Sequence, residues 1–500
     1  MTLEELVRVS RNLLPVKLDG EAYKRIQASR KIVDDFVERK AVVYGVTTGI
    51  GKLCDIFISQ EDCVELQKNI VISHAAGVGK AFPSDVVRGM MLLRINNFAK
   101  GFSGVCQKTV DTMVSMLNKG VHPIVPQKGS LGASGDLAPL SHMVLPMIGM
   151  GKAEYQGVVL PGKEAMEKAG IPIIDLYAKE GVALINGTQA MTSVGGLSLY
   201  DAIMLVKTAD IAAALTFEAC NGITCALDEK VHGIRPHKGQ VNTAHTLRNL
   251  LEGSEMTTKQ GDLRVQDPYT LRCVPQIHGA TKNAVRYVRE QVELEMNSVT
   301  DNPIVFSEHG QVISGGNFHG QPMALSFDFL GIAAAELANV SERRIERLVN
   351  PQLNYGLPAF LVEKSGLQSG YMILQYTAAA LVSENKVLAH PASVDSIPSS
   401  ANQEDHVSMG TIAARKAAEI VENVRHTLAT ELICAVQAID LRGKKKLGKG
   451  TEEAYKAIRA VVPMLLTDRE IHEDVTLCEN ILLDGSLIDK VEKAAGEIVI

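Results

Sequence analysis

The chain has 500 residues, more than one hydrophobic core usually organises, so we expect two or more sub-domains. Its hydrophobic fraction of 46% is ample for a large core, and its low aromatic content of 4% favours packed helices over sheets. The net charge of −6 is too small to indicate a nucleic acid or a membrane as a partner.

The N-terminal part predicts helices on either side of a glycine-rich loop. Apolar residues recur at three- and four-residue spacing over 21–39 and 62–119, which predicts amphipathic helices. The loop at 44–51 lacks the glycine spacing of a phosphate-binding loop. Residues 152–181 are typical of turns and short strands. The chain start lacks the pattern of a signal peptide and no Cys-x-x-Cys spacing occurs, so we expect a reduced, cytoplasmic protein.

The rest of the chain predicts long helices. A helical pattern runs over 186–221, and a polar stretch at 228–272 is expected to form an extended loop. Further helical patterns cover 276–299, 322–349, 370–389 and 407–440. Helices this long indicate a bundle core or a subunit interface. We therefore predict a mainly α protein, with a mixed N-terminal domain at 1–185 and a helical-bundle domain at 186–500.

A short stretch at 129–139, Gly-Ser-Leu-Gly-Ala-Ser-Gly-Asp-Leu-Ala-Pro, carries the most specific chemical signal. Three glycines and flanking proline-punctuated apolar sequence indicate a loop held inside the fold. The Gly135 nitrogen has no Cβ beside it and is able to attack the Ala133 carbonyl carbon. Loss of the Ser134 hydroxyl as water then leaves an exocyclic carbon–carbon double bond.

This stretch resembles the signature of the aromatic amino-acid ammonia-lyases and aminomutases. In that family the Ala-Ser-Gly triad becomes 4-methylidene-imidazol-5-one (MIO), an electrophile built from the chain itself, so the resemblance implies MIO at Ala133, Ser134 and Gly135 and no external cofactor. It covers most of the chain and implies a long-helix bundle core of the fumarase/aspartase type. It also implies a homotetramer whose sites combine residues from several subunits.

The resemblance assigns catalytic roles to three further residues. Asn186 matches an asparagine that hydrogen-bonds near the ring, and an amide donor suits negative charge developing on the ring carbonyl. Tyr44 and Tyr269 match two family tyrosines, either of which is a candidate for the base that removes the β-hydrogen. The loop departs from the family pattern at Thr47 and Ile50, which leaves its supporting contacts open.

Five residues match the family's substrate pocket. Arg272 is expected to bind the substrate carboxylate through two parallel hydrogen bonds, with Gln266 and Phe318 lining the site. His74 follows the pattern of histidine-specific members. Glu404 stands where phenylalanine- and tyrosine-specific members carry a neutral glutamine. A carboxylate suits the N–H donors and the charge of an imidazole, whereas beside a phenyl ring it would be desolvated without compensation.

The resemblance therefore implies non-oxidative deamination of L-histidine to trans-urocanate and ammonia. Two alternatives stay open: a lyase or 2,3-aminomutase of the same family acting on tyrosine or phenylalanine, and a non-catalytic helical scaffold. No His-Glu-x-x-His or Gly-x-Ser-x-Gly motif is present, so we expect neither a metal site nor a hydrolase nucleophile. The basic segment at 442–449 is expected to be a solvated loop rather than a nucleic-acid contact.

Overall fold

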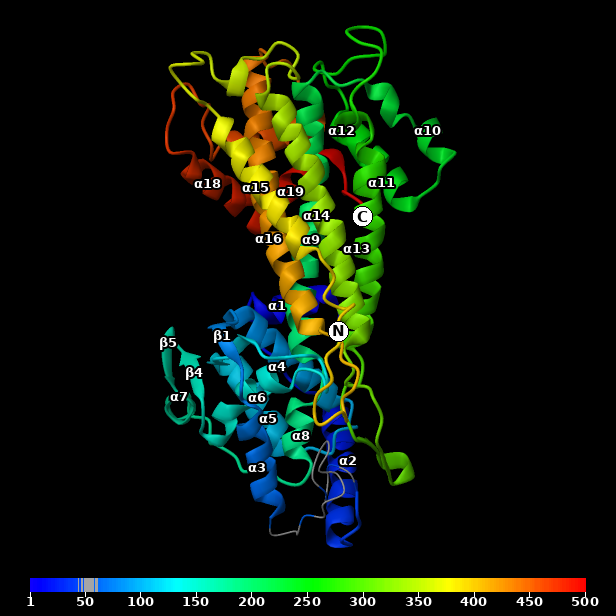
Figure 1. Cartoon of the computed structure of the whole chain (residues 1–500), viewed down its shortest axis with the longest axis vertical. Helices are drawn as coiled ribbons and strands as arrows, with labels where there is room; N and C mark the ends of the chain where they lie inside the picture. The colour runs from blue at the N-terminus through cyan, green and yellow to red at the C-terminus, as the bar shows by residue number, and fades with distance from the viewer. Residues whose placement is uncertain (44, 46–47, 49–57, 59–61) are drawn as a thin grey trace. The chain divides into compact units, whose positions relative to one another are not determined.

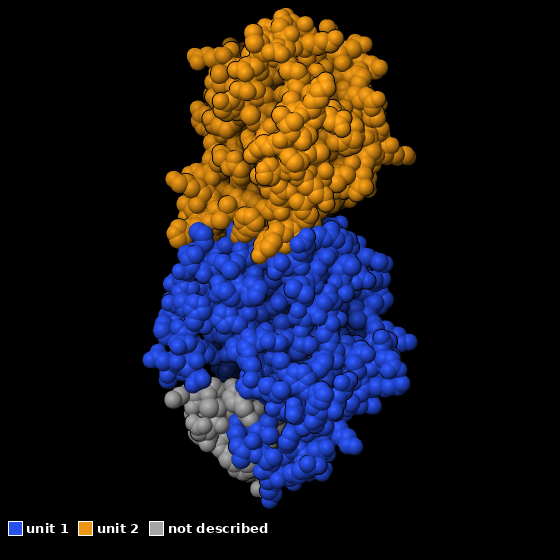
Figure 2. Space-filling view, turned by 90° about the vertical axis from the view of Figure 1, so that its right-hand side faces the viewer, with its two compact units in different colours: residues 1–200, 289–328, 391–415 blue, residues 201–288, 329–390, 416–500 orange. Residues whose placement is uncertain are grey.

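The computed structural model describes residues 1–43, 45, 48, 58 and 62–500. It divides into two compact units, each assembled from separate parts of the chain (Figure 2). Unit 1 comprises residues 1–200, 289–328 and 391–415, and unit 2 comprises residues 201–288, 329–390 and 416–500.

Unit 1 combines short helices with three small antiparallel sheets (Figure 1). Its helices are α1 (Leu3–Ser10), α2 (Gly20–Glu38), α3 (Cys63–His74), α4 (Ser84–Ala99), α5 (Gln107–Lys119), α6 (Leu137–Val144), η2 (Leu145–Ile148), α7 (Gly162–Lys168), α8 (Glu180–Ile185) and η4 (Ser307–His309). Its strands are β1 (Val78–Ala81), β2 (Val121–Pro123), β3 (Pro126–Lys128), β4 (Lys152–Tyr155), β5 (Val158–Pro161), β6 (Ile304–Phe306) and β7 (Gln311–Ile313). The strands pair as β1–β3, β2–β4–β5 and β6–β7.

Apart from two isolated β-bridges, Ile223–Thr258 and Ser365–Gln368, the described secondary structure of unit 2 is helical. Its elements are η3 (Thr224–Leu227), α10 (Glu229–Gly233), α11 (Lys238–Leu250), α12 (Tyr269–Arg272), η5 (Ala359–Leu361), α15 (Met372–Leu388), α17 (Lys449–Arg459), α18 (Ile471–Leu483) and α19 (Ser486–Ala495). Four longer helices contribute residues to both units: α9 (Gln189–Ala219), α13 (Val274–Met296), α14 (Gln321–Val349) and α16 (Gly410–Leu441).

The predicted mainly helical fold with long bundle helices is confirmed. The expectation of an extended loop over 228–272 is wrong for its middle part, where α11 forms a 13-residue helix. One face of α11 is buried through Thr243, Leu247 and Leu250, but its small and polar residues hide this periodicity in the sequence. Tertiary packing outweighs weak local propensity here.

Helix α4 is buried on nearly every side, which differs from the amphipathic helix predicted for this region. Besides its apolar residues, it buries the side chains of Arg88 and Arg94. The guanidinium of Arg88 donates to the main-chain carbonyls of Val9 and Leu117, at 2.9 and 2.8 Å. Buried charges persist when hydrogen bonds satisfy them, so α4 acts as a central element of unit 1.

A fully buried polar network joins α9, α13, α14 and α16 within unit 2. The Lys282 Nζ lies 2.6 Å from an Asp210 carboxylate oxygen, and the His278 Nδ1 lies 2.8 Å from the other. The Arg344 guanidinium donates two parallel hydrogen bonds to the Glu431 carboxylate, at 2.6 and 2.8 Å. All five side chains have no exposed surface, and the Lys282–Asp210 and Arg344–Glu431 pairs compensate the buried charges inside the bundle.

Acidification is expected to destabilise this bundle through His278. Burial lowers the pKa of His278, and the Arg344 guanidinium facing its Nε2 at 3.3 Å acts in the same direction, although the hydrogen bond to Asp210 opposes both. Below the ordinary pKa near 6.5 the unfolded chain therefore binds a proton that the folded chain does not. As the pH decreases below this value, the free energy of unfolding should therefore decrease by up to about 1.4 kcal/mol per pH unit through this group.

The measurement is thermal denaturation of the wild type and His278→Gln between neutral pH and about pH 5, the range in which an unfolded-state histidine titrates. We expect a shallower decline in the variant. An identical decline would contradict a neutral, buried His278.

By length and composition alone, α14 qualifies as a membrane-crossing helix, but 67% of its most apolar window is buried inside the protein. It is the one such helix in the part of the chain that the structure describes. Within unit 2, Arg344 on α14 pairs with Glu431 on α16, and both side chains are fully buried, as is typical of a helix in the core of a bundle.

Candidate active site

The predicted Ala-Ser-Gly stretch forms a tight, internally braced loop just before α6. The chain bends through 132–134, and Gly132 and Gly135 have positive φ angles of 67° and 73°. Gly135 forms a β-bridge with Gly187, and the following Asp136 nitrogen donates to the Gly187 oxygen at 2.7 Å. A Cβ on Gly135 would lie 2.3 Å from that oxygen. Only glycine therefore fits at this position.

Asn186 lies directly over this loop, in the turn between α8 and α9. Its Nδ2 donates to the Ser134 main-chain oxygen at 2.9 Å, and only 5% of the residue is exposed. Its Oδ1 is buried and has no hydrogen-bond partner among the described residues. The structure thus places the Asn186 amide donor on the main-chain oxygen of Ser134, the middle residue of the triad.

Asp136 anchors the other end of the loop and was not singled out from the sequence. It is fully buried, and its carboxylate accepts hydrogen bonds from Ser130 at 2.9 Å, from the Met191 nitrogen at 2.8 Å and from Thr411. Burial raises its pKa, although these hydrogen bonds pull in the opposite direction. The signal available in the sequence was an acidic residue within an otherwise apolar, small-residue stretch.

Glu404 lies at the loop, as the predicted site requires. The Ser134 Oγ donates to its Oε1 at 2.6 Å, across 270 positions of sequence. The second carboxylate oxygen accepts from the Ser399 Oγ at 2.9 Å. Ser399 and Glu404 also form an antiparallel β-bridge, which closes a turn in which residues 400–402 all have positive φ. Left-handed backbone at three consecutive non-glycine residues is costly, so this turn is held by its surroundings and is typical of a functional segment.

The segment that follows Glu404 packs against the loop. Val407 and Met409 form a small hydrophobic cluster with Ala133, and the Met409 nitrogen donates to the Leu131 oxygen at 2.9 Å. These contacts fix the distance between the carboxylate-bearing turn and the Ala-Ser-Gly triad.

Arg94 on α4 supports Asn186 from behind. Its guanidinium donates to the Asn186 main-chain oxygen at 2.6 Å, to the Gln189 Oε1 at 3.1 Å and to the Ala183 oxygen. The residue is completely buried, which lowers its pKa to about 10. It was missed from the sequence, where the available signal was a lone arginine within the run Met90–Ile95.

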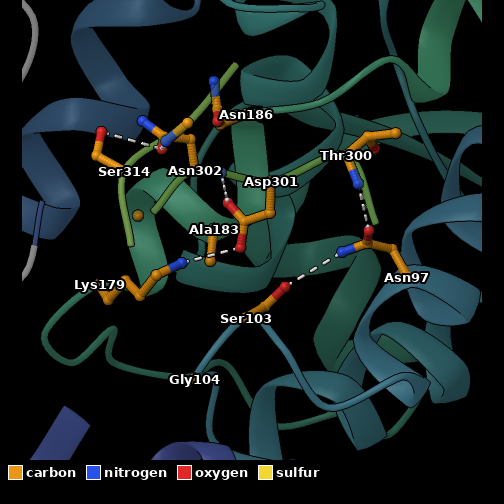
Figure 3. Close-up of polar contacts among 12 residues, drawn as sticks. Asn97, Ser103, Gly104, Lys179, Ala183, Asn186, Thr300, Asp301, Asn302 and Ser314 are labelled. Carbon is orange, nitrogen blue, oxygen red and sulfur yellow. Dashed lines mark hydrogen bonds and ion pairs between the residues drawn. The ribbon is translucent and has the colours of Figure 1, made fainter. Parts of the chain in front are cut away.

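A second braced segment, residues 300–302, lies close to Asn186 (Figure 3). The Thr300 nitrogen donates to the Asn97 side chain at 3.0 Å, and Asp301 pairs with Lys179 at 2.9 Å with both side chains fully buried (Figure 3). The Gln189 amide links this segment to the Arg94 network through a 2.8 Å bond to the Thr300 hydroxyl. Asn186 is therefore held by rigid, hydrogen-bonded surroundings.

A family model for aromatic amino acid lyases matches residues 1–460. The chain belongs to the aromatic amino acid lyase family.

Relatives within the family cover nearly the whole chain. A histidine ammonia-lyase of Alkaliphilus oremlandii is 61% identical over 494 residues, which is 99% of this chain and 97% of the relative. The crystal structure of histidine ammonia-lyase from Trypanosoma cruzi superimposes with a TM-score of 0.93 at 40% identity, covering 99% of this chain and 94% of that one. A tyrosine aminomutase from Streptomyces globisporus gives a TM-score of 0.95 at 37% identity, covering 99% and 98%.

Two more of the residues matched to the lyase family lie in unit 1 together with the loop. His74 is the last residue of α3, and its Nδ1 lies 2.7 Å from the Ile70 carbonyl oxygen. Because that oxygen only accepts, Nδ1 carries a proton, and the neutral ring therefore presents Nε2 as an acceptor. Phe318 is half-buried in the segment between β7 and α14.

The remaining matched residues fall elsewhere. Gln266, Tyr269 and Arg272 belong to unit 2, where the Arg272 guanidinium lies 4.6 Å from the centre of the Tyr269 ring. The Arg272 Nε is buried without a hydrogen-bond partner among the described residues. Tyr44 and the family departures at Thr47 and Ile50 lie outside the described residues. No group of three potential metal-ligating side chains occurs in the described part of the chain.

Replacing Gly135 with alanine is expected to disrupt the loop. The new Cβ would collide with the Gly187 carbonyl, and a positive φ costs a residue with a side chain about 1–2 kcal/mol on its own. Gly157→Ala is the matched control, because Gly157 has a φ of 79° and no atom within 4 Å of the added Cβ. We expect activity to be lost in the first variant and kept in the second. Equal activity in both would show that the contact with Gly187 is not needed.

Proposed function

We propose that the chain deaminates L-histidine to trans-urocanate and ammonia, and that Ala133, Ser134 and Gly135 first cyclise to MIO. The observation that carries the proposal is the 2.6 Å contact between Ser134 and Glu404. It brings the serine of the ring precursor together with the carboxylate that suits an imidazole. The Alkaliphilus and Trypanosoma histidine ammonia-lyases support the same substrate.

The loop fits the group. Gly135 is free of a Cβ at a place where none fits, Gly132 and Gly135 adopt the positive φ angles of a sharp turn, and Asn186 donates to the carbonyl that the ring would keep. When formed, MIO supplies an electrophilic exocyclic carbon. Asn186 stabilises negative charge that develops on the Ser134 oxygen, because a donor is already aimed at that atom.

The substrate is bound by groups of complementary charge. In this proposal the site combines residues from several copies of the chain: Arg272 binds the α-carboxylate, Glu404 accepts an imidazole N–H, and His74 offers Nε2 to the same ring. Gln266 and Phe318 line the pocket, and Tyr44 or Tyr269 removes the β-hydrogen. A tyrosine titrates ordinarily near pH 10, so either one needs a neighbouring cation to act as a base.

The active form in this proposal is a cytoplasmic homotetramer whose partners are other copies of the chain and a small amino acid. Apolar side chains exposed on the long helices support self-association, because large exposed apolar residues commonly mark interfaces. They are Tyr287 and Leu294 on α13, Leu325, Phe329 and Ile332 on α14, and Ile373 and Tyr376 on α15.

The proposal is tested by incubating the purified protein separately with L-histidine, L-tyrosine and L-phenylalanine and following the ultraviolet absorbance of the conjugated acid. We expect a signal with L-histidine alone. A signal only with tyrosine or phenylalanine would contradict the proposal and indicate a lyase or aminomutase for that substrate. No signal with any of the three would favour a scaffold role.

A further inference from the structure

The hydroxyl that must leave during ring formation is the one held by Glu404. The Ser134 Oγ to Glu404 Oε1 distance of 2.6 Å is that of a short hydrogen bond to a charged acceptor, which is stronger than a neutral one. In the linear chain, this contact occupies the carboxylate oxygen that the proposed substrate needs. Before the ring forms, Glu404 is therefore hydrogen-bonded to Ser134 and not to a ligand.

Glu404 is itself held rigidly for this contact. The Ser399 Oγ binds its second oxygen at 2.9 Å, and main-chain hydrogen bonds of 2.9 and 3.3 Å join Ser399 and Glu404 across the turn. The turn packs through Val407 and Met409 onto Ala133. Such bracing fixes the carboxylate relative to the triad rather than leaving it free to follow the serine.

We propose that Glu404 is a positioning residue for maturation: its carboxylate holds the Ser134 hydroxyl in the rotamer from which water is lost, and it becomes available to substrate only afterwards. This inference rests on the proposed function. In the step concerned, the Cα–H and Cβ–O bonds of Ser134 break and a Cα–Cβ double bond forms. The Cα proton and the hydroxyl leave together as one water molecule, so no oxidant or reductant is needed.

The physical reason is conformational. A serine hydroxyl samples three staggered rotamers, and elimination requires the Cβ–O bond to be aligned with the developing double bond. A hydrogen bond to a fixed charged acceptor selects one rotamer. With three staggered rotamers of similar population, its loss should slow the dehydration by up to about threefold, because the productive rotamer is then only one of three. Once water has left, the Oε1 has lost its donor and can accept an imidazole N–H.

The test follows the mass of the chain with time after synthesis, because each matured chain is lighter by two water molecules. Glu404→Ala is expected to mature up to about threefold more slowly than the wild type. Glu404→Gln should mature at nearly the wild-type rate, since its amide oxygen still accepts the hydrogen bond, yet it should lose activity on histidine. Asp405→Ala is the matched control, which removes the neighbouring exposed carboxylate and should mature normally.

The outcomes separate this inference from the proposed function. A wild-type chain without the two-water deficit would refute the MIO assignment itself. A wild type with the deficit and Glu404→Ala maturing equally fast would overturn only the role of Glu404. Glu404→Gln maturing as slowly as Glu404→Ala would overturn the hydrogen-bond explanation. If Glu404→Ala fails to fold, Ser399→Ala decides, because it keeps the carboxylate but removes its brace: slower maturation supports the inference, and an unchanged rate contradicts it.

Discussion

Replacing Ser134 with alanine is expected to abolish deamination of L-histidine, with a loss of about a thousandfold or more, as is typical when an enzyme loses its reactive group. Alanine supplies no hydroxyl to leave, so the exocyclic carbon–carbon double bond cannot form. The fold should survive, because Ser134 is half-buried and, among the described residues, its side chain makes one hydrogen bond, to Glu404. That bond is worth roughly 1–3 kcal/mol to stability.

The measurement pairs the ultraviolet assay with intact mass and thermal denaturation. We expect an inactive variant with the full linear mass of its sequence and a melting temperature within a few degrees of the wild type. Full activity in this variant would show that the Ala-Ser-Gly triad is not needed for the reaction. An unfolded variant would leave Gly135→Ala and its Gly157→Ala control to decide.

Replacing Asn186 with alanine is expected to lower kcat by about a hundredfold to a thousandfold, the usual cost of removing one donor from a developing oxyanion. The amide is aimed at the Ser134 oxygen at 2.9 Å, and Arg94 and Gly187 fix the turn that carries it. KM should change much less than kcat, because the donor acts on charge that appears during reaction.

The matched control is Asn96→Ala, which removes an amide-to-carbonyl hydrogen bond of 2.8 Å to Met296, also in unit 1. Both variants should lose similar stability and keep the two-water mass deficit, but only Asn186→Ala should lose turnover. A comparable loss of turnover in the control would mean that general loosening of the unit, rather than the missing donor, explains the effect.

The parts of the site that follow from local sequence were predictable, and the parts that depend on distant packing were not. Glycines mark the Ala-Ser-Gly loop in the sequence, and in the structure these glycines have positive φ angles. The long helices follow from sustained apolar patterns. Arg94 escaped prediction because its acceptors lie about ninety residues away, at Ala183 and Asn186, and nothing near it in the sequence indicates them.

Helix α11 and the contacts of Asp136 also depend on packing between distant parts of the chain. Helix α11 buries one face, but its small polar residues give no clear apolar pattern in the sequence. Asp136 accepts hydrogen bonds from Thr411 and Met191, which are distant from it in the sequence. The catalytic and binding roles of all the matched site residues remain predictions, as does the division of the chain into domains at 1–185 and 186–500.

The most direct test of the account is the mass of the mature, active protein, combined with mapping of the peptide that contains residues 129–139. We predict a chain lighter than its sequence by two water molecules, with the whole deficit located in that peptide. A mature and fully active protein with the unreduced mass of three linear peptide units at Ala133, Ser134 and Gly135 would contradict the account.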